Sequence, residues 1–216
     1  MMKSNKIALL GGVFAVAVLI VIGAIIYSIV NDKRDKGNEM FAYTEQQTLG
    51  EKEANIHITV FSDFKCPACR TWDATVLPRL KEEYINKGTA QLHLINFPFI
   101  GEDSEYGAVV GEAIYKQDPE AFWTFFDELY QHQKGDKEEW ITKELVTNIV
   151  TEKLPNINVE QLEKDANSKE IKDMVKEDHD RALKLKVQGA PSIYVNGNLV
   201  NPDYDSIKAA IEKLKK

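Results

Sequence analysis

Cys66 and Cys69 are the only cysteines in the chain, and they stand two residues apart in the stretch FSDFKCPACRTW. Thiols at this spacing exchange disulfides, bind a metal ion or form a short structural disulfide. Zinc needs four ligands, and His93, separated from Cys69 by 23 residues, does not fit the spacing of a zinc finger. A non-sequential zinc site that adds His57 and His93 stays open. A structural disulfide across so small a loop would stabilise the fold little, because loop-closure entropy grows with loop length.

The residues around the pair favour redox chemistry. The stretch IHITVF predicts a buried strand that ends just before the cysteines, and helix signals start at Pro67. Cys66 would then be the N-cap, where the N–H groups of Ala68 and Cys69 and the helix dipole favour a thiolate. Neighbouring Lys65 adds positive charge. We therefore expect Cys66 to be the nucleophile and better leaving group, and the shielded Cys69 to be the resolving thiol.

Hydrophobic periodicity predicts the elements that position the pair. Their order is β-α-β, a helical block of roughly 85 residues, and β-β-α. Pro78 predicts a kink in the first helix, Asp118 predicts a helix N-cap, and Asn196-Gly197 predicts a type I′ hairpin. The expected strands lie at 56–61, at 90–97 and within 189–201; the expected helices include 67–86, 142–151, 159–167, 169–186 and one from about 203.

An apolar stretch precedes this domain. Residues 7–30 carry no charge, and as a helix they would span roughly 36 Å, enough to cross a bilayer. The run is longer than the apolar region of a signal peptide, and no small-x-small cleavage site follows it. The sequence predicts a tail at 1–6, an uncleaved transmembrane helix at 7–30, a polar linker at 31–54 whose aromatic residues dock on the domain, and a domain at 55–216.

Charge excludes a nucleic-acid partner. Residues 37–216 hold 22 basic and 32 acidic side chains, a net charge of −10 that repels phosphate. Lysine and arginine lie on both sides of the apolar stretch, so the positive-inside rule does not favour an exported domain. We base the expected orientation, with the domain on the extracytoplasmic side of the cell membrane, on the cysteine chemistry instead.

Several of these features together resemble the DsbA branch of the thioredoxin superfamily. They are C-P-A-C at a strand-to-helix junction, Gly-Ala-Pro (189–191) before a hairpin, and the long helical block. FSDFKCPAC and EAIYKQDPEAFW (112–123), with the anchor, are most similar to the membrane-attached oxidases of the BdbD type from Bacillus. The resemblance covers roughly 55–216 and implies an α/β thioredoxin fold with a helical insertion at about 101–186.

The resemblance also implies roles for individual residues. Pro191 would be a cis-proline facing the disulfide, and Ala190 would offer its backbone N–H and C=O to an extended substrate segment. Pro67 and Ala68 would border the same surface. From the residues alone, Pro191 also fits a trans proline that opens a strand.

Two positions depart from the family pattern. Thioredoxin and DsbA have an acidic residue six positions before the first cysteine, where this chain has Val60. Cys69 therefore lacks the usual proton acceptor. Ala68 replaces the histidine of CPHC-type oxidases. The sequence therefore predicts the exchange chemistry and leaves the redox potential open.

A calcium site is a second expectation. Asp178 falls in phase with the apolar stripe of its helix, and a carboxylate on an inward face needs a cation or hydrogen-bond donors. Relatives of the BdbD type are associated with calcium, and Glu112 would be a second ligand, because calcium prefers carboxylate oxygens. The alternative is a salt bridge or a partly exposed Asp178.

These observations predict a membrane-anchored thiol-disulfide oxidoreductase that introduces disulfides into exported proteins through Cys66 and Cys69, without any cofactor for the exchange itself. The family suggests a DsbB-like, quinone-linked membrane protein as the re-oxidant. The alternatives are a reductase or isomerase on the same fold, or an anchored binding or chaperone module with a structural disulfide.

Overall fold

The computed structural model describes residues 18–23 and 37–215. The chain divides into two units, Met1–Met40 and Phe41–Lys216, and the fold below is that of the second. Among the described residues, no helix is both long and apolar enough to cross a bilayer. Except for residues 18–23, which are helical, the predicted tail and anchor lie outside the described residues.

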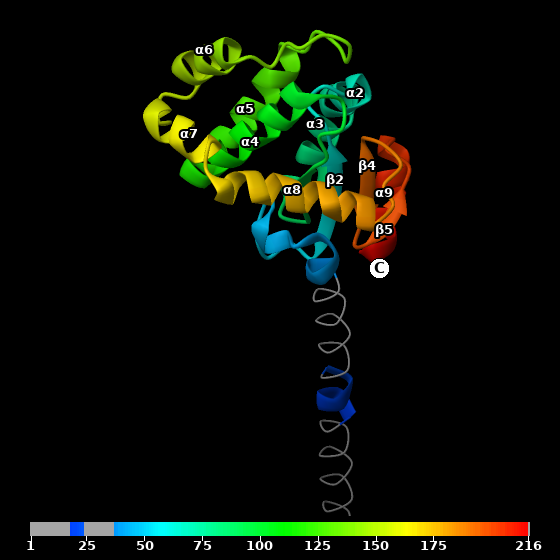
Figure 1. Cartoon of the computed structure of the whole chain (residues 1–216). Helices are drawn as coiled ribbons and strands as arrows, with labels where there is room; N and C mark the ends of the chain where they lie inside the picture. Colours follow the sequence, from blue (N-terminus) through cyan, green and yellow to red (C-terminus); the bar gives the residue numbers. More distant parts are fainter. Residues whose placement is uncertain (1–17, 24–36, 216) are drawn as a thin grey trace, which may run out of the picture. The chain divides into compact units, whose positions relative to one another are not determined.

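A five-stranded sheet of order β1-β3-β2-β4-β5 forms the centre of the domain (Figure 1). The parallel strands β2 and β3 lie at its middle, because both are rich in branched and aliphatic residues and are buried along almost their whole length. The other neighbours pair antiparallel. The strands are β1 Gln47–Leu49, β2 Ile56–Ser62, β3 Ala90–Asn96, β4 Ser192–Val195 and β5 Asn198–Val200.

The first half of the domain is the predicted β-α-β unit. The predicted helix at 67–86 is divided into α2 (Pro67–Thr75), α3 (Leu77–Leu80) and a π-helical turn, η2 (Lys81–Ile85). The break falls at Val76, just before Pro78, as expected for a proline that cannot continue the hydrogen-bond ladder.

The helical insertion between β3 and β4 is confirmed. Helices α4 to α7 gather into one lobe, and α8 runs from that lobe back toward the sheet (Figure 1). Polar side chains cap four of the five N-termini, and Asp118 accepts from Glu120 N and Ala121 N as predicted. The helices are α4 Glu102–Gln117, α5 Pro119–Gln131, α6 Lys143–Lys153, α7 Val159–Ala166 and α8 Lys169–Lys184.

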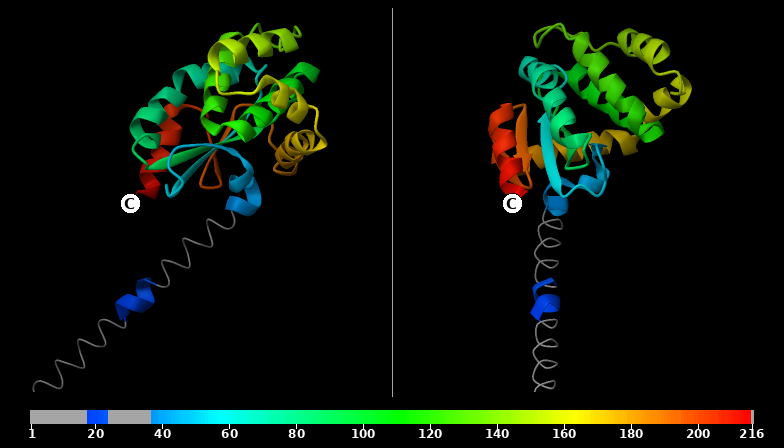
Figure 2. Two further views of the ribbon diagram at one scale, coloured as in Figure 1. Left: turned by 90° about the vertical axis from the view of Figure 1, so that its left-hand side faces the viewer. Right: turned by 180° about the vertical axis from the view of Figure 1, so that it is seen from behind.

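The C-terminal β-β-α unit completes the sheet. Asn196 and Gly197 join β4 to β5 with φ values of 43° and 82°, the positive values that a type I′ turn requires. Helix α9 (Tyr204–Leu214) packs against both strands, away from the lobe of α4 to α7 (Figure 2). Asp203 caps it by accepting from Ser206 N.

The domain starts earlier than predicted. Phe41 and Tyr43 are buried within the core, and β1 (Gln47–Leu49) pairs with β3. The predicted docking of the aromatic residues Phe41 and Tyr43 on the domain is therefore confirmed, whereas the linker bounds 31–54 are wrong from residue 41 onward, as is the domain boundary at 55. A strand of three residues within a polar stretch has too little periodicity to be recognised in the sequence.

Candidate active site

The cysteine pair lies at the junction of β2 and α2. Cys66 has extended backbone dihedrals and is the N-cap of α2, with Pro67 at the first helical position, as the sequence predicts. Cys69, one turn further, is buried. Both residues are free thiols in this structure. The Cys66 thiol donates a hydrogen bond to the carbonyl oxygen of Ala190, with a sulfur–oxygen distance of 3.2 Å.

The surroundings of Cys66 favour its thiolate. A hydrogen bond from the Cys69 thiol has the largest effect and, with the backbone N–H groups of Cys69 and Ala68, lowers the pKa of Cys66 to about 7. Burial and the charge of Asp63 oppose this shift without cancelling it. The predicted N–H groups at the helix start are therefore present and act on the sulfur.

Cys69 has the opposite preference. Burial raises the pKa of its thiol, and the hydrogen bond to Cys66 and the charge of Cys66 raise it further. A hydrogen bond with the Ser62 side chain and another with the Asp63 backbone counteract only part of this. Near pH 7 Cys66 of the reduced pair is therefore about half ionised, while Cys69 keeps its proton.

Contrary to the prediction from the sequence, the charge of Lys65 is not directed at the Cys66 thiolate. Its side chain is 3 % exposed, and its Nζ forms an ion pair with Asp103 Oδ1 at 2.7 Å. The backbone N–H groups of Trp140 and Ile141 donate to the other oxygen of Asp103. Because its charge is neutralised inside the helical lobe, Lys65 joins the active-site loop to α4 instead of acting on Cys66.

Asp63 is a structural residue that sequence reasoning missed. Its buried carboxylate accepts from the backbone N–H of Lys65 at 2.7 Å, from those of Phe99 and Ile100 at 2.9 and 3.1 Å, and from the hydroxyl of Ser104. It therefore ties together the loop before Cys66, the loop after β3 and the start of α4. An aspartate at the end of a buried strand was the available signal.

The loop before β4 lies against the cysteines. The Ala190–Pro191 peptide bond is cis, as the resemblance implied, and the Ala190 carbonyl oxygen faces the Cys66 sulfur. Pro67 and Ala68 are exposed at the start of α2. The structure thus brings Ala190 and Pro191 to the same surface as Pro67 and Ala68, beside Cys66.

Val60 lies in the middle of β2, almost fully buried, with Leu94 and Ile193 as its partners in the neighbouring strands. The polar atoms near Cys69 come instead from two hydroxyl groups. The Ser62 Oγ and the Tyr130 OH are 2.7 Å apart, and Tyr130 also donates to the Asp63 carbonyl oxygen at 3.3 Å.

The histidines do not complete a zinc site at the cysteines. His57 Nδ1 and His93 Nε2 hydrogen-bond to each other at 2.9 Å, and the Tyr43 ring stacks on both rings. Within the described ranges, no three side chains from His, Cys, Asp and Glu are arranged to hold a metal ion.

Glu112 and Asp178 lie together in a second buried cluster, between α4, α8 and β3. Asn96 links them: its side-chain amide donates to Glu112 at 2.7 Å, and its backbone N–H donates to Asp178 at 3.0 Å. Gln46 also donates to Asp178, at 2.9 Å. Burial and, to a smaller extent, the charge of Asp178 raise the pKa of Glu112 to about 8, and burial raises the pKa of Asp178 to about 6.

Some side-chain oxygen atoms in or beside this cluster have no hydrogen-bond partner. In the part of the chain that the structure describes, the side-chain oxygens of Gln46 and Gln47 are buried without a hydrogen-bond partner. Buried polar atoms are rarely left in this state. Two carboxylates with nearby amide oxygens fit the ligand preference of calcium, so the predicted residues fit the predicted ion.

Comparisons with known proteins agree with this geometry. The thioredoxin family model matches residues 43–213. A probable disulfide bond formation protein D of Bacillus anthracis is 69 % identical over the full length of both chains, and disulfide bond formation protein D of Bacillus subtilis is 30 % identical over 85 % of each. The crystal structure of oxidised BdbD from Bacillus subtilis matches with a TM-score of 0.75 and 31 % identity, covering 80 % of this chain and 95 % of that one.

Proposed function

This chain belongs to the thioredoxin family and is a DsbA-like thiol-disulfide oxidoreductase, and on that premise we propose that Cys66 and Cys69 are its exchanging pair and that it introduces disulfides into exported proteins. The observation that carries the proposal is the contrast between the two thiols. One is stabilised as a thiolate at a helix N-terminus, and its partner is buried and protonated.

The reaction proceeds by two exchanges. A substrate thiolate attacks the Cys66 sulfur, the Cys66–Cys69 bond breaks, and the electron pair leaves on Cys69, which takes up a proton. The second substrate thiolate then attacks the substrate sulfur of the mixed disulfide. Cys66 leaves as a thiolate that the helix N-terminus stabilises. The substrate is oxidised by two electrons and the cysteine pair is reduced by two.

The surface beside Cys66 holds the substrate. The backbone of Ala190 pairs with an extended substrate segment, and Pro191, Pro67 and Ala68 border it. The Ala190 carbonyl oxygen supports this, because it lies 3.2 Å from the sulfur at which the exchange occurs.

Replacing single cysteines tests the pair. With a client protein that contains a disulfide, the Cys66 thiolate of Cys69→Ser should attack that disulfide and release one client thiolate, and the mixed disulfide should accumulate because the resolving thiol is missing. Cys66→Ser should form none. An anchored binding or chaperone module would instead keep its full activity in both variants. Stable adducts formed through residue 69 would contradict the assigned roles.

Stabilisation of the Cys66 thiolate favours an oxidase, because it stabilises the reduced form of the pair. Equilibration of the chain with a glutathione redox series measures this. A potential close to that of DsbA supports the oxidase, and one close to that of thioredoxin selects the reductase or isomerase.

Residues 7–30 anchor the protein in the cell membrane with the domain on the extracytoplasmic side, close to a DsbB-like, quinone-linked protein that re-oxidises Cys66 and Cys69. The length and lack of charge of this stretch support the anchor. Protease added to intact protoplasts should digest the domain. Protection until the cells are lysed would contradict this orientation.

Glu112 and Asp178 hold a structural calcium ion, which would neutralise their buried charges and use the unpaired oxygen atoms near them. Added CaCl2 should raise the unfolding temperature, and more strongly as pH rises through about 8, because the ion requires an ionised Glu112. Glu112→Gln and Asp178→Asn should lose this response. An unfolding temperature that is the same in calcium and in chelator would refute the site.

A further inference from the structure

The first exchange creates a buried anion. When a substrate thiolate attacks Cys66, the electron pair leaves on Cys69, whose side chain is buried and whose pKa burial raises. A thiolate in such a place is costly unless it receives a proton as it forms. Val60 occupies the position at which thioredoxin and DsbA have an acidic residue, and its side chain has no proton to donate.

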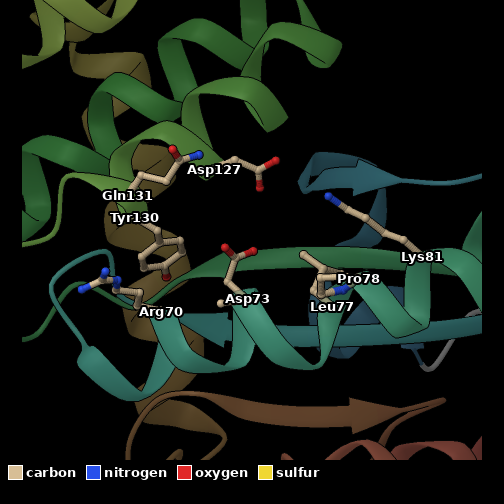
Figure 3. Close-up of a pocket in the computed structure, with 9 residues that line it drawn as sticks. Arg70, Asp73, Leu77, Pro78, Lys81, Asp127, Tyr130 and Gln131 are labelled. Atoms are coloured by element: carbon tan, nitrogen blue, oxygen red, sulfur yellow. The ribbon is translucent and has the colours of Figure 1, made fainter.

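A cleft beside α2 is lined by two acidic side chains, Asp73 and Asp127. It has a volume of about 410 Å³ and lies between α2, η2 and α5. Figure 3 shows the Asp73 carboxylate pointing from α2 into this cleft toward Asp127 of α5, with the Lys81 side chain opposite and Tyr130 beside Asp73. Asp73 follows Cys69 by four residues, so the two side chains share one face of α2.

Two hydroxyl groups join the cleft to the sulfur. Tyr130 lines the cleft, and its OH lies 2.7 Å from Ser62 Oγ, which is itself within hydrogen-bonding reach of Cys69. The charges of both Cys69 and Asp73 act on the Tyr130 hydroxyl, so both groups lie near it. Asp73 is half-buried, and a cleft of about 410 Å³ has room for a water that would bridge Asp73 and Tyr130.

We propose that Asp73 supplies the proton that Cys69 needs when the disulfide opens, through Tyr130 and Ser62, and takes it back when the disulfide re-forms. This rests on the proposed function, in which Cys66 and Cys69 are the exchanging pair. Asp73 therefore acts on Cys69 only through Tyr130 and Ser62 and is not itself a catalytic residue.

The steps balance. As the Cys66–Cys69 bond breaks, the Ser62 hydroxyl gives its proton to Cys69. The Tyr130 hydroxyl turns from the Asp63 carbonyl oxygen to Ser62 Oγ and replaces that proton, and the carboxylic acid of Asp73 replaces the proton of Tyr130. Asp73 ends as a carboxylate and no electrons move beyond the exchange itself. Burial raises the pKa of Tyr130 well above its ordinary value, so Tyr130 passes a proton on only while receiving another.

The charges around Asp73 suit this exchange. Burial and, to a smaller extent, the charge of Asp127 raise the pKa of Asp73 to about 7, although the Lys81 ammonium opposes this shift. Arg70 lies at the edge of the cleft, and Tyr130 faces it from α5. A group that is half-protonated near neutral pH gives and accepts a proton equally well.

The test is the pH dependence of the first exchange. Oxidised full-length chain is mixed with glutathione, the reaction is quenched with acid, and the rate constant is expressed per glutathione thiolate. In the unmodified chain this rate constant should fall as pH rises through about 7, because Asp73 loses its proton. Asp73→Asn should be on the order of 10²-fold slower at pH 6 without this inflection, and Asp73→Glu should restore part of both.

Two neighbouring variants move the inflection in opposite directions. Asp127→Asn removes a repelling charge and should shift it to lower pH, whereas Lys81→Met removes an attracting charge and should shift it to higher pH. The thiolate absorbance of Cys66 should titrate nearly unchanged in all four variants, because none of these side chains is among the main groups that shift the pKa of Cys66.

An inflection that survives in Asp73→Asn overturns the proposal. So does a loss in Asp73→Asn of the same factor at every pH, which marks a structural defect. Failure of the unmodified chain to form a glutathione adduct on Cys66 would refute the proposed function instead.

Discussion

The ion pair between Lys65 and Asp103 makes a prediction that separates stability from reactivity. The two side chains are 3 % and 8 % exposed, so Lys65→Met leaves a buried carboxylate without its cation. Breaking such a pair costs about 3–5 kcal/mol. Asp103 keeps the N–H groups of Trp140 and Ile141 at 2.9 and 3.3 Å, which favours the lower end of that range. For a domain of this size, about 3 kcal/mol lowers the unfolding temperature by roughly 6–12 °C.

The same substitution should leave the reactive thiol as it is. The groups that set the pKa of Cys66 are Cys69, Ala68, Asp63 and its own burial, and the Lys65 charge is not among them. We therefore expect Lys65→Met to lose stability while its Cys66 thiol still titrates near pH 7.

Thermal unfolding and the ultraviolet absorbance of the thiolate measure the two effects on one sample. Lys87→Met, at an exposed lysine, is the matched control and should change neither. In the double variant with Asp103→Asn, part of the stability should return, because the lone buried charge is gone.

Lowering the pH should reduce the difference in stability between the unmodified chain and Lys65→Met. In the unmodified chain, burial tends to raise the pKa of Asp103, but Lys65 and the two N–H groups outweigh burial and lower it. The pair's contribution is therefore lost as pH falls through this lowered pKa. A rise of one unit or more in the pKa of Cys66, with little change in stability, would refute the reasoning and restore the role that the sequence suggested for Lys65.

Three further predictions concern the scaffold. Phe41→Ala should cost about 3–5 kcal/mol in urea unfolding, because its ring is fully buried, whereas Leu199→Ala at an exposed position should cost far less; equal losses would contradict the boundary at residue 41. Burial, with a contribution from His57, lowers the pKa of His93 to about 3, so the fold should lose stability as pH falls from about 6.5 toward 3, and His93→Gln should lose less over that interval. Gln133→Leu should cost about 1–3 kcal/mol, because Gln133 donates to the buried carbonyl oxygens of Phe64 and Cys66; unchanged unfolding would show that other donors replace it.

Local signals in the sequence were sufficient for the main elements and for the reactive thiol. A cysteine that follows a strand of β-branched residues and precedes Pro67 is recognisable as a helix N-cap. The N–H groups that act on its sulfur belong to the next residues along the chain. The type I′ turn at Asn196-Gly197 and the cap at Asp118 depend on equally short patterns. Such features need no knowledge of the rest of the fold.

The wrong or missing parts depend on partners distant in sequence. Lys65 pairs with a carboxylate 38 positions away, which adjacency to Cys66 does not reveal. The contacts of Asp63 come from two other loops, and Asp73 meets Asp127 only because α2 and α5 face one cleft. Asp178 was found because its helical phase placed it inward, although its phase did not identify Asn96 and Gln46 as neighbours.

The contact between Cys66 and Ala190 has a consequence for the order in which the protein becomes active. These residues are 124 positions apart, and they meet only because β4 pairs with β2. A growing chain therefore completes its C-P-A-C segment long before it contains the strand that presents Ala190. Until that strand docks, the thiols have no backbone partner with which to align a client. If Ala190 aligns the client as proposed, disulfide exchange begins only when nearly the entire polypeptide has been synthesised, and a prematurely terminated chain would carry the two thiols without substrate selection.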